Sequence, residues 1–173
     1  MYKRQVHSIA FANREDLSGE FIDTPREGFL KALEISSYSL IPIARLGAHL
    51  LEKNHGSIIT MTFQASERVF PGYNVMATAK SALENSVKNL AYDLGKKQIR
   101  INAISAGPLD TLSSRVISRY KDMKTYNADK APLQRNITFE EVANTALFLC
   151  SDLSTGITGE IIHVDAGYNI MGI

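Results

Sequence analysis

A tyrosine and a lysine stand seven positions apart in the stretch GYNVMATAKSA, at Tyr73 and Lys80, within a pattern that predicts an apolar helix. Seven residues make almost two helical turns, so both side chains leave the same face about 10.5 Å apart along the axis. A lysine side chain is long enough to cover much of that gap. An ammonium near a phenol favours the phenolate, and a group lying between the two would feel both. The spacing therefore permits catalysis by this pair.

The same spacing also arises without a catalytic role. The chain has 7 tyrosines and many scattered lysines, so a pair at this distance is expected often by chance. The alternative interpretation is a half-buried tyrosine and a solvated lysine on an ordinary helix. The surrounding elements must decide between the two.

The composition indicates one compact domain over residues 1–173. Of the 173 residues 45% are hydrophobic, which is enough for a sizeable core. A net charge of +1 and a pI near 7.8 offer no basic stripe for phosphate groups. We therefore expect no nucleic-acid partner, and no membrane, because no segment reaches the length of a membrane span.

Cysteine and histidine usage predicts neither a disulfide nor a metal site. Cys150 is the only cysteine, and its apolar surroundings in VANTALFLC favour a buried, reduced thiol in a cytoplasmic protein. The run after Met1 is too short for a signal core. His7 and His163 lack a second ligand at metal spacing, so we expect packed or hydrogen-bonded imidazoles.

Four short apolar, β-branched runs predict buried strands, at residues 6–11, 57–62, 99–104 and 160–164. The segments between them are helical patterns too long for hairpin loops. This alternation predicts an α/β fold, a parallel sheet with helices on both faces.

Helix boundaries are marked at several positions. Thr24 with Glu27, and Thr138 with Glu141, have the spacing of a capping box. Pro42 lies inside a helical run that continues to about residue 51, so that helix is expected to be kinked there or made of two pieces. The helix carrying the tyrosine and lysine is predicted from about residue 71 to 94, with a glycine stop at 95.

A glycine-rich turn is missing from this pattern. A doubly wound nucleotide-binding sheet normally opens with a strand, a glycine-rich turn and a helix whose amino end holds the pyrophosphate. Here the glycines are dispersed, and the first predicted strand begins near the start. One side of the sheet is then left without a partner, so the sequence looks like the second part of something larger.

Several stretches together resemble one family. HSIAFA, ISSYSL, YNVMATAKSALE, IRINAISAGPLDTL, FLCSDLSTGITGE and HVDAG occur in the order and spacing of the bacterial enoyl-acyl carrier protein reductases, within the short-chain dehydrogenase/reductase superfamily. The resemblance extends over nearly the whole chain. It implies a three-layer, Rossmann-like fold from which the amino-terminal glycine-rich part is missing, and a cytoplasmic homotetramer.

The resemblance also implies a reaction. Members reduce the double bond next to the thioester of a fatty acyl chain on acyl carrier protein, using NADH or NADPH. Hydride goes to the β-carbon, and negative charge develops on the thioester oxygen. By resemblance, Tyr73 donates a hydrogen bond to that oxygen, and Lys80 holds the nicotinamide ribose hydroxyls and supplies a positive field.

Further site residues follow from the same resemblance. The family contacts substrate at the position of Ala12, and many members have a second tyrosine at the position of Phe63, which keeps the ring and lacks the hydroxyl. The residues implied to bind the cofactor are Ile9, Lys80, Leu109, Asp110, Thr111, Leu112 and Ser113.

Two more departures concern the cofactor. Asp110 stands where arginine is common and places a negative charge near the expected phosphates, which weakens nucleotide binding unless the carboxylate points away. Ala77 stands where glycine is usual.

The segment 113–130 is basic and corresponds to the substrate-binding region of the family. Its cations are expected either to form a solvated face or to dock the acidic acyl carrier protein. They are Arg115, Arg119, Lys121, Lys124 and Lys130, against Asp122 and Asp129.

Two alternatives remain open. A ketoreductase of the same superfamily would use a hydroxyl such as that of Thr60, thirteen residues before Tyr73. A non-catalytic subunit would keep only the assembly surfaces, for which the resemblance implies the helices of Tyr38 and Tyr73.

Overall fold

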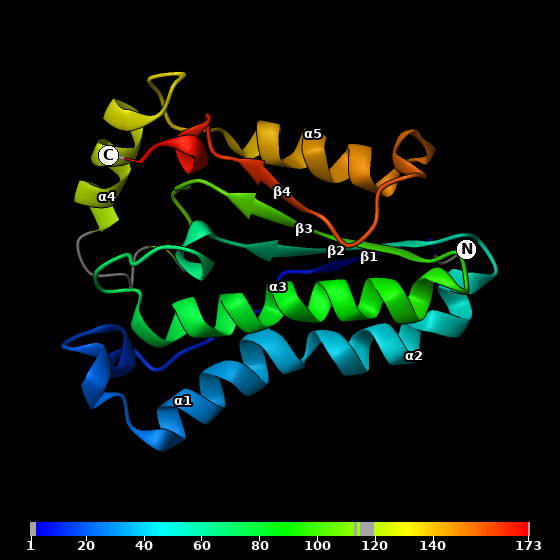
Figure 1. The fold of residues 1–173 in the computed structure, drawn as a ribbon, viewed down its shortest axis with the longest axis horizontal. Coiled ribbons are helices and arrows are strands. Elements are labelled where there is room, and N and C mark those ends of the chain that lie inside the picture. The colour runs from blue at the N-terminus through cyan, green and yellow to red at the C-terminus, as the bar shows by residue number, and fades with distance from the viewer. Residues whose placement is uncertain (1–2, 113, 115–119, 173) are drawn as a thin grey trace.

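The computed structural model describes residues 3–112, 114 and 120–172. Four parallel strands form one sheet in the order β1-β2-β3-β4, so each strand lies beside the one that precedes it in the chain. The strands are β1 (Arg4–His7), β2 (Ser57–Thr62), β3 (Arg100–Ala106) and β4 (Ile161–Val164). The expected α/β fold with a parallel sheet is confirmed (Figure 1).

Helices cover both faces of this sheet. The helices α1 (Arg26–Leu33), α2 (Leu40–Glu52) and α3 (Asn74–Gly95) lie on one side, and α5 (Phe139–Cys150) lies on the other (Figure 1). The helix α4 (Tyr120–Lys130) lies beyond the carboxyl ends of the strands. None of the helices in the described part of the chain is long and apolar enough to cross a membrane.

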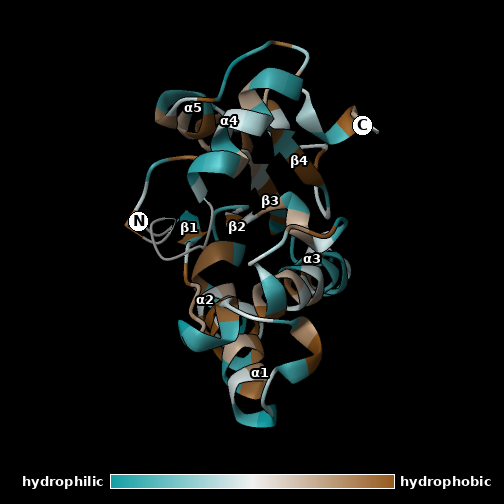
Figure 2. Cartoon of the chain, turned by 90° about the vertical axis from the view of Figure 1, so that its left-hand side faces the viewer, coloured by the Kyte–Doolittle hydropathy of each residue, from teal (hydrophilic) through white to brown (hydrophobic). Residues whose placement is uncertain are grey.

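Because both faces are covered, neighbouring strand residues are buried in opposite directions. Ile58 of β2 packs with Leu83 and Val87 of α3, whereas Ile59 packs with Leu149 of α5. Figure 2 shows hydrophobic residues on the strands between the two helix layers. This double burial explains why the strands are continuous apolar runs in the sequence.

The first strand is shorter than the sequence predicts. The run 6–11 is apolar, but β1 ends at His7. Beyond it, the backbone N–H and C=O of Phe11 bond the Ser36 hydroxyl, at 2.8 and 2.9 Å, instead of a neighbouring strand. Residues 8–12 are thereby free of the sheet and lie at its carboxyl end.

The helical run around Pro42 is made of two pieces, and the break precedes the proline. One π-helical turn, Glu34–Tyr38, separates α1 from α2, with Ser39 N–H donating to Glu34 O at 3.1 Å. Pro42 therefore lies in the first turn of α2, directly after this π-helical turn.

One of the two predicted capping boxes is confirmed. Thr138 Oγ1 accepts from Glu141 N–H, and the Glu141 carboxylate accepts from Thr138 N–H at 2.8 Å. The prediction at Thr24 is wrong, because its hydroxyl donates to Phe21 O at 2.7 Å and no side chain caps α1. The Thr24 hydroxyl thus bonds the preceding 3₁₀ turn, Phe21–Asp23, instead of capping α1.

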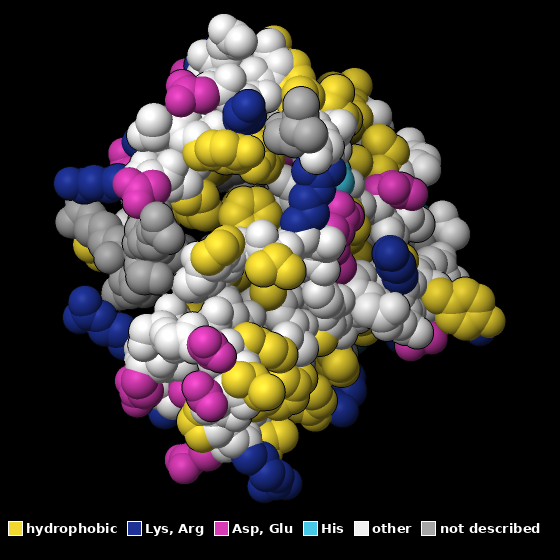
Figure 3. Space-filling view, turned by 60° about the vertical axis from the view of Figure 1, so that its left-hand side comes forward, with side chains coloured by type: hydrophobic (Ala, Val, Ile, Leu, Met, Phe, Trp, Pro, Cys, Tyr) yellow, Lys and Arg dark blue, Asp and Glu magenta, His cyan; other side chains and the backbone are white. Residues whose placement is uncertain are grey.

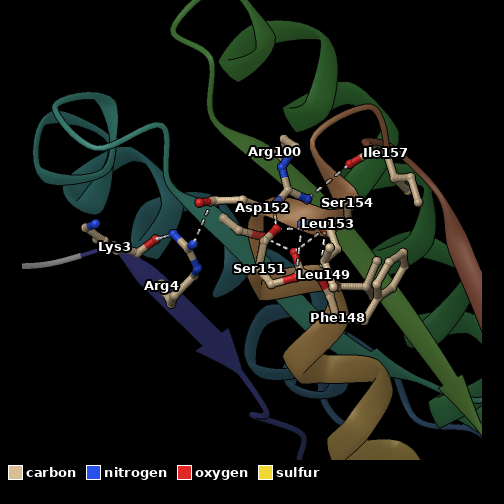
Figure 4. Close-up of polar contacts among 11 residues, drawn as sticks. Lys3, Arg4, Arg100, Phe148, Leu149, Ser151, Asp152, Leu153, Ser154 and Ile157 are labelled. Atoms are coloured by element: carbon tan, nitrogen blue, oxygen red, sulfur yellow. Dashed lines mark hydrogen bonds and ion pairs between the residues drawn. The ribbon is translucent and has the colours of Figure 1, made fainter.

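The amino ends of the strands are fastened to the end of α5 (Figure 4). The buried guanidinium of Arg100 donates to Ser151 O at 3.0 Å, and Arg4 pairs with Asp152 at 3.5 Å. Cys150 at this end is a free thiol, half-buried rather than buried as expected, and burial raises its pKa. This fastening leaves the opposite, carboxyl end of the sheet open.

Candidate active site

A cavity of about 680 Å³ lies at the carboxyl ends of β1, β2 and β3. Strand ends form its floor, and Figure 3 shows hydrophobic side chains gathered around a hollow at this end of the molecule. In an open α/β sheet, ligands bind at this edge. The lining comprises residues 8–12, 61–63 and 106–109 together with Leu17, Tyr73, Met76, Lys80, Thr111, Ser114, Tyr120 and Met123.

Tyr73 enters the cavity from the residue just before α3. It is the N-cap of that helix, and Asn74 takes a φ of 37°, a left-handed conformation that asparagine tolerates. The Phe63 ring packs edge-on against the Tyr73 ring, with centroids 5.1 Å apart. Burial raises the pKa of Tyr73, so its phenol is protonated at neutral pH and is a hydrogen-bond donor.

Lys80 reaches the same cavity from two turns further along α3. Its ammonium donates to Met61 O at 2.8 Å, and the residue is 6% exposed. Burial lowers the pKa of Lys80 to about 8, and the charge of Glu84 partly opposes this shift. The interpretation as a solvated lysine is therefore wrong.

Five other residues implied by the sequence also line this cavity. They are Ile9, Ala12, Phe63, Leu109 and Thr111. Together with Tyr73 and Lys80 these residues come from four separate stretches of chain, and the parallel sheet brings them together because its strands all end at the same edge.

Of the remaining three residues from that set, the structure describes two, and neither lines the cavity. Asp110 and Leu112 are not among the lining residues: the Asp110 carboxylate pairs with Lys124, and Leu112 is 81% exposed. The Asp110 charge is thus partly neutralised and directed at α4. Ser113 lies outside the described residues.

Sequence reasoning missed Tyr120 and Met123, which line the cavity from α4. The Tyr120 hydroxyl donates to Leu109 O at 2.5 Å, and burial raises the pKa of this phenol. Their spacing of three residues places both on one face of a helix, and this spacing could have indicated a shared contact. The many charged residues around them in the segment hid this pattern.

Thr60 and His7 lie outside the cavity lining. Nδ1 of the buried His7 lies 2.8 Å from Thr60 Oγ1, and Nε2 lies 2.9 Å from Ser39 Oγ. The expectation of a hydrogen-bonded His7 is confirmed. The Thr60 hydroxyl, which a ketoreductase would need beside the tyrosine, is bonded to His7 instead. Among the described residues, no group of three or more acidic, histidine or cysteine side chains has the arrangement of a metal site.

Comparison with known proteins places this chain in a family. A family model described as enoyl-(acyl carrier protein) reductase matches residues 4–169. The chain belongs to the enoyl-(acyl carrier protein) reductase family. The reductase (NADH) of Bacillus cereus is 52% identical over 167 residues, and that of Rickettsia typhi is 51% identical over 167 residues.

Solved structures agree with this membership. The enoyl-[acyl-carrier-protein] reductase (NADH) of Aquifex aeolicus superposes with a TM-score of 0.96 at 48% identity, over 99% of this chain and 66% of that one. The Bacillus cereus reductase, solved with NADP+ and indole naphthyridinone, gives 0.96 at 51% identity. The two curated relatives are matched over 96% of this chain, which spans 65% and 64% of their own length.

Proposed function

We propose that this family member takes part in NADH- or NADPH-dependent reduction of the enoyl double bond of acyl-carrier-protein thioesters. The observation that carries the proposal is that Tyr73 and Lys80, both buried, share one cavity at the carboxyl edge of the sheet. A protonated phenol and an ammonium there meet the needs of a reaction that develops negative charge on an oxygen.

In this proposal, Tyr73 donates its phenolic hydrogen bond to the thioester oxygen. The hydroxyl stays protonated because burial raises its pKa, so it acts as a donor where an enolate forms. Lys80 remains mostly charged at pH 7 because its pKa is about 8. Its positive field favours the same developing charge.

The residues present fit the nicotinamide end of a dinucleotide. Lys80 offers an ammonium for ribose hydroxyls, and Ile9, Leu109 and Thr111 supply apolar and polar walls beside it. Gly107 also lines the cavity, and its lack of a Cβ allows the close approach of Asp165, whose Cα would lie 3.2 Å from such an atom. When bound, the nicotinamide supplies the hydride. Asp110, Leu112 and Ser113 belong to the proposed cofactor set by family resemblance alone.

The acyl thioester would lie between Ala12 and Phe63, against the apolar wall that Met123 completes. Acyl carrier protein is the proposed partner, and a homotetramer in the cytoplasm the proposed state. The basic face of α4 is weaker than its sequence suggests, because Lys124 pairs with Asp110 and Lys130 lies 5.9 Å from the Tyr126 ring centroid. Arg115 and Arg119 lie outside the described residues.

Titration of NADH and NADPH into the purified chain tests the proposal, followed by nucleotide oxidation with a crotonyl thioester. We expect saturable binding and faster oxidation with the crotonyl than with an acetoacetyl thioester. Preference for the acetoacetyl compound would identify a ketoreductase. Absence of nucleotide binding would identify a non-catalytic subunit, and either result would overturn the proposal.

A further inference from the structure

Lys80 and Glu84 leave one face of α3 a single turn apart, and both are buried, with 6% and 8% of their surface exposed. Consecutive residues at the end of β2 hold their polar atoms. Met61 O accepts from Lys80 Nζ at 2.8 Å, and Thr62 Oγ1 donates to Glu84 Oε1 at 2.6 Å. The strand end thereby fixes an ammonium and a carboxylate on the same turn of the helix.

The two charges have different surroundings. Lys80 and Thr62 line the cavity, whereas Glu84 is not among the described residues that do so. A buried carboxylate is costly unless it is hydrogen-bonded or paired with a positive charge. The Thr62 hydroxyl supplies a hydrogen bond, and the Lys80 ammonium leaves the same face of α3 one turn away. Glu84 is therefore placed to act on Lys80 without touching a ligand.

We propose that Glu84 is a positioning residue for Lys80, and that Thr62 directs its carboxylate. The charge of Glu84 opposes the effect of burial, which lowers the pKa of the Lys80 ammonium. The inference rests on the role proposed above for Lys80, since a charged ammonium is what holds the ribose hydroxyls and favours the enolate.

Other titratable groups also act on Lys80. His7 on β1 is electrostatically coupled to it, and the phenols of Tyr73 and Tyr120 share its cavity. His7 is held by Thr60 and Ser39 and has its pKa lowered by burial, so it is neutral at the pH values where Lys80 titrates. The two phenols have raised pKa values and titrate above that range. Glu84 is thus the charged neighbour that opposes the effect of burial on the pKa of Lys80.

The test is the titration of Lys80 itself, monitored by NMR of the chain labelled with ¹³Cε-lysine. A Lys80→Met variant assigns the Lys80 signal. We expect Glu84→Gln, which keeps the acceptor for Thr62 and removes the charge, to lower the Lys80 midpoint by about one pH unit. Glu84→Asp keeps the charge on a shorter side chain and should lower it less. Asp93→Asn removes an exposed carboxylate from the same helix and should leave the midpoint in place.

A Lys80 midpoint that is the same in wild type, Glu84→Asp and Glu84→Gln would overturn the inference. If Glu84→Gln does not fold, Glu84→Asp decides, because a midpoint at or above the wild-type value contradicts the proposed role. The midpoint is measured without nucleotide, so this result is independent of the proposed function. A separate NADH titration of the wild-type chain tests that function, and the coupling of Glu84 to Lys80 stands or falls without it.

Discussion

The ring of Phe63 meets the ring of Tyr73 edge-on, with centroids 5.1 Å apart and an interplanar angle of 61°. The Phe70 ring also packs against the Phe63 ring, with centroids 4.8 Å apart. The strand end that carries Phe63 and the helix start that carries Tyr73 are thus joined through aromatic packing. The position of the phenol in the cavity depends on this contact.

Replacing Phe63 should therefore disturb stability before chemistry. We expect Phe63→Ala to lower the free energy of unfolding by about 2 kcal/mol, since the residue is partly rather than fully buried. Phe63→Tyr keeps the ring and should stay near the wild-type value. Urea unfolding measures both, and the exposed Phe21→Ala is the matched control. Equal losses for Phe63→Ala and Phe21→Ala would contradict the packing role.

Removing the Tyr73 hydroxyl should affect turnover far more than nucleotide affinity. We expect Tyr73→Phe to lower kcat with a crotonyl thioester by about 10²-fold, because the donor acts on charge that develops in the transition state. The dissociation constant for NADH should change little. Tyr92→Phe, in the same helix but 73% exposed, is the control. A Tyr73→Phe enzyme with wild-type kcat would remove the phenol from the proposed mechanism.

The buried Lys80 should make stability depend on alkaline pH. Its pKa falls from 10.5 to about 8 in the folded chain, so between these values the unfolded chain binds more protons and stability rises with pH. Lys80→Met lacks this dependence. The free energy of unfolding of wild type relative to Lys80→Met should therefore rise by about 2 kcal/mol between pH 8 and pH 10.

Urea unfolding of wild type and Lys80→Met between pH 8 and pH 10 measures this difference in the free energy of unfolding. Lys53→Met, at an exposed position, is the control and should show a constant difference from wild type. If the difference in unfolding free energy between Lys80→Met and wild type stays constant with pH, the Lys80 ammonium is solvated.

His7 should make the fold sensitive to acid. Burial, and then the charge of Lys80, lowers its pKa below 6.5, so the unfolded chain binds its proton first as the pH falls. The stabilising contribution of the neutral imidazole is present above pH 6.5 and is lost as the pH falls through the folded pKa. We expect His7→Gln to lose less stability than wild type between pH 7.5 and pH 5.5. His49→Gln, which is exposed, should follow the wild-type curve.

The two threonines with capping-box spacing should differ in a matched comparison. Thr138→Ala removes an observed cap and should lower the free energy of unfolding by about 1 kcal/mol. Thr24→Ala removes a hydroxyl that bonds only a preceding turn, so a smaller loss is expected. Chemical denaturation of the two variants gives the comparison, and equal losses would mean that the box at Thr138 contributes nothing beyond a turn contact.

The sequence by itself determined the features that local chemistry controls. Alternating apolar runs and helical patterns predicted the parallel α/β fold, and the spacing of Thr138 and Glu141 predicted a real cap. Family resemblance implied one shared site around Tyr73 and Lys80, and both residues line one cavity at the carboxyl ends of the parallel strands.

Only the tertiary structure decided the features that depend on residues far apart. The Ser36 hydroxyl bonds the backbone N–H and C=O of Phe11, which therefore do not extend the first strand. Asp110 pairs with Lys124 and does not line the cavity. The burial of Lys80 and of Glu84, and their hydrogen bonds to the end of β2, follow from packing against that strand. A sequence pattern predicts which side chains are present and how they are spaced. Their charge states and partners depend on desolvation and on contacts that exist only once the layers have packed.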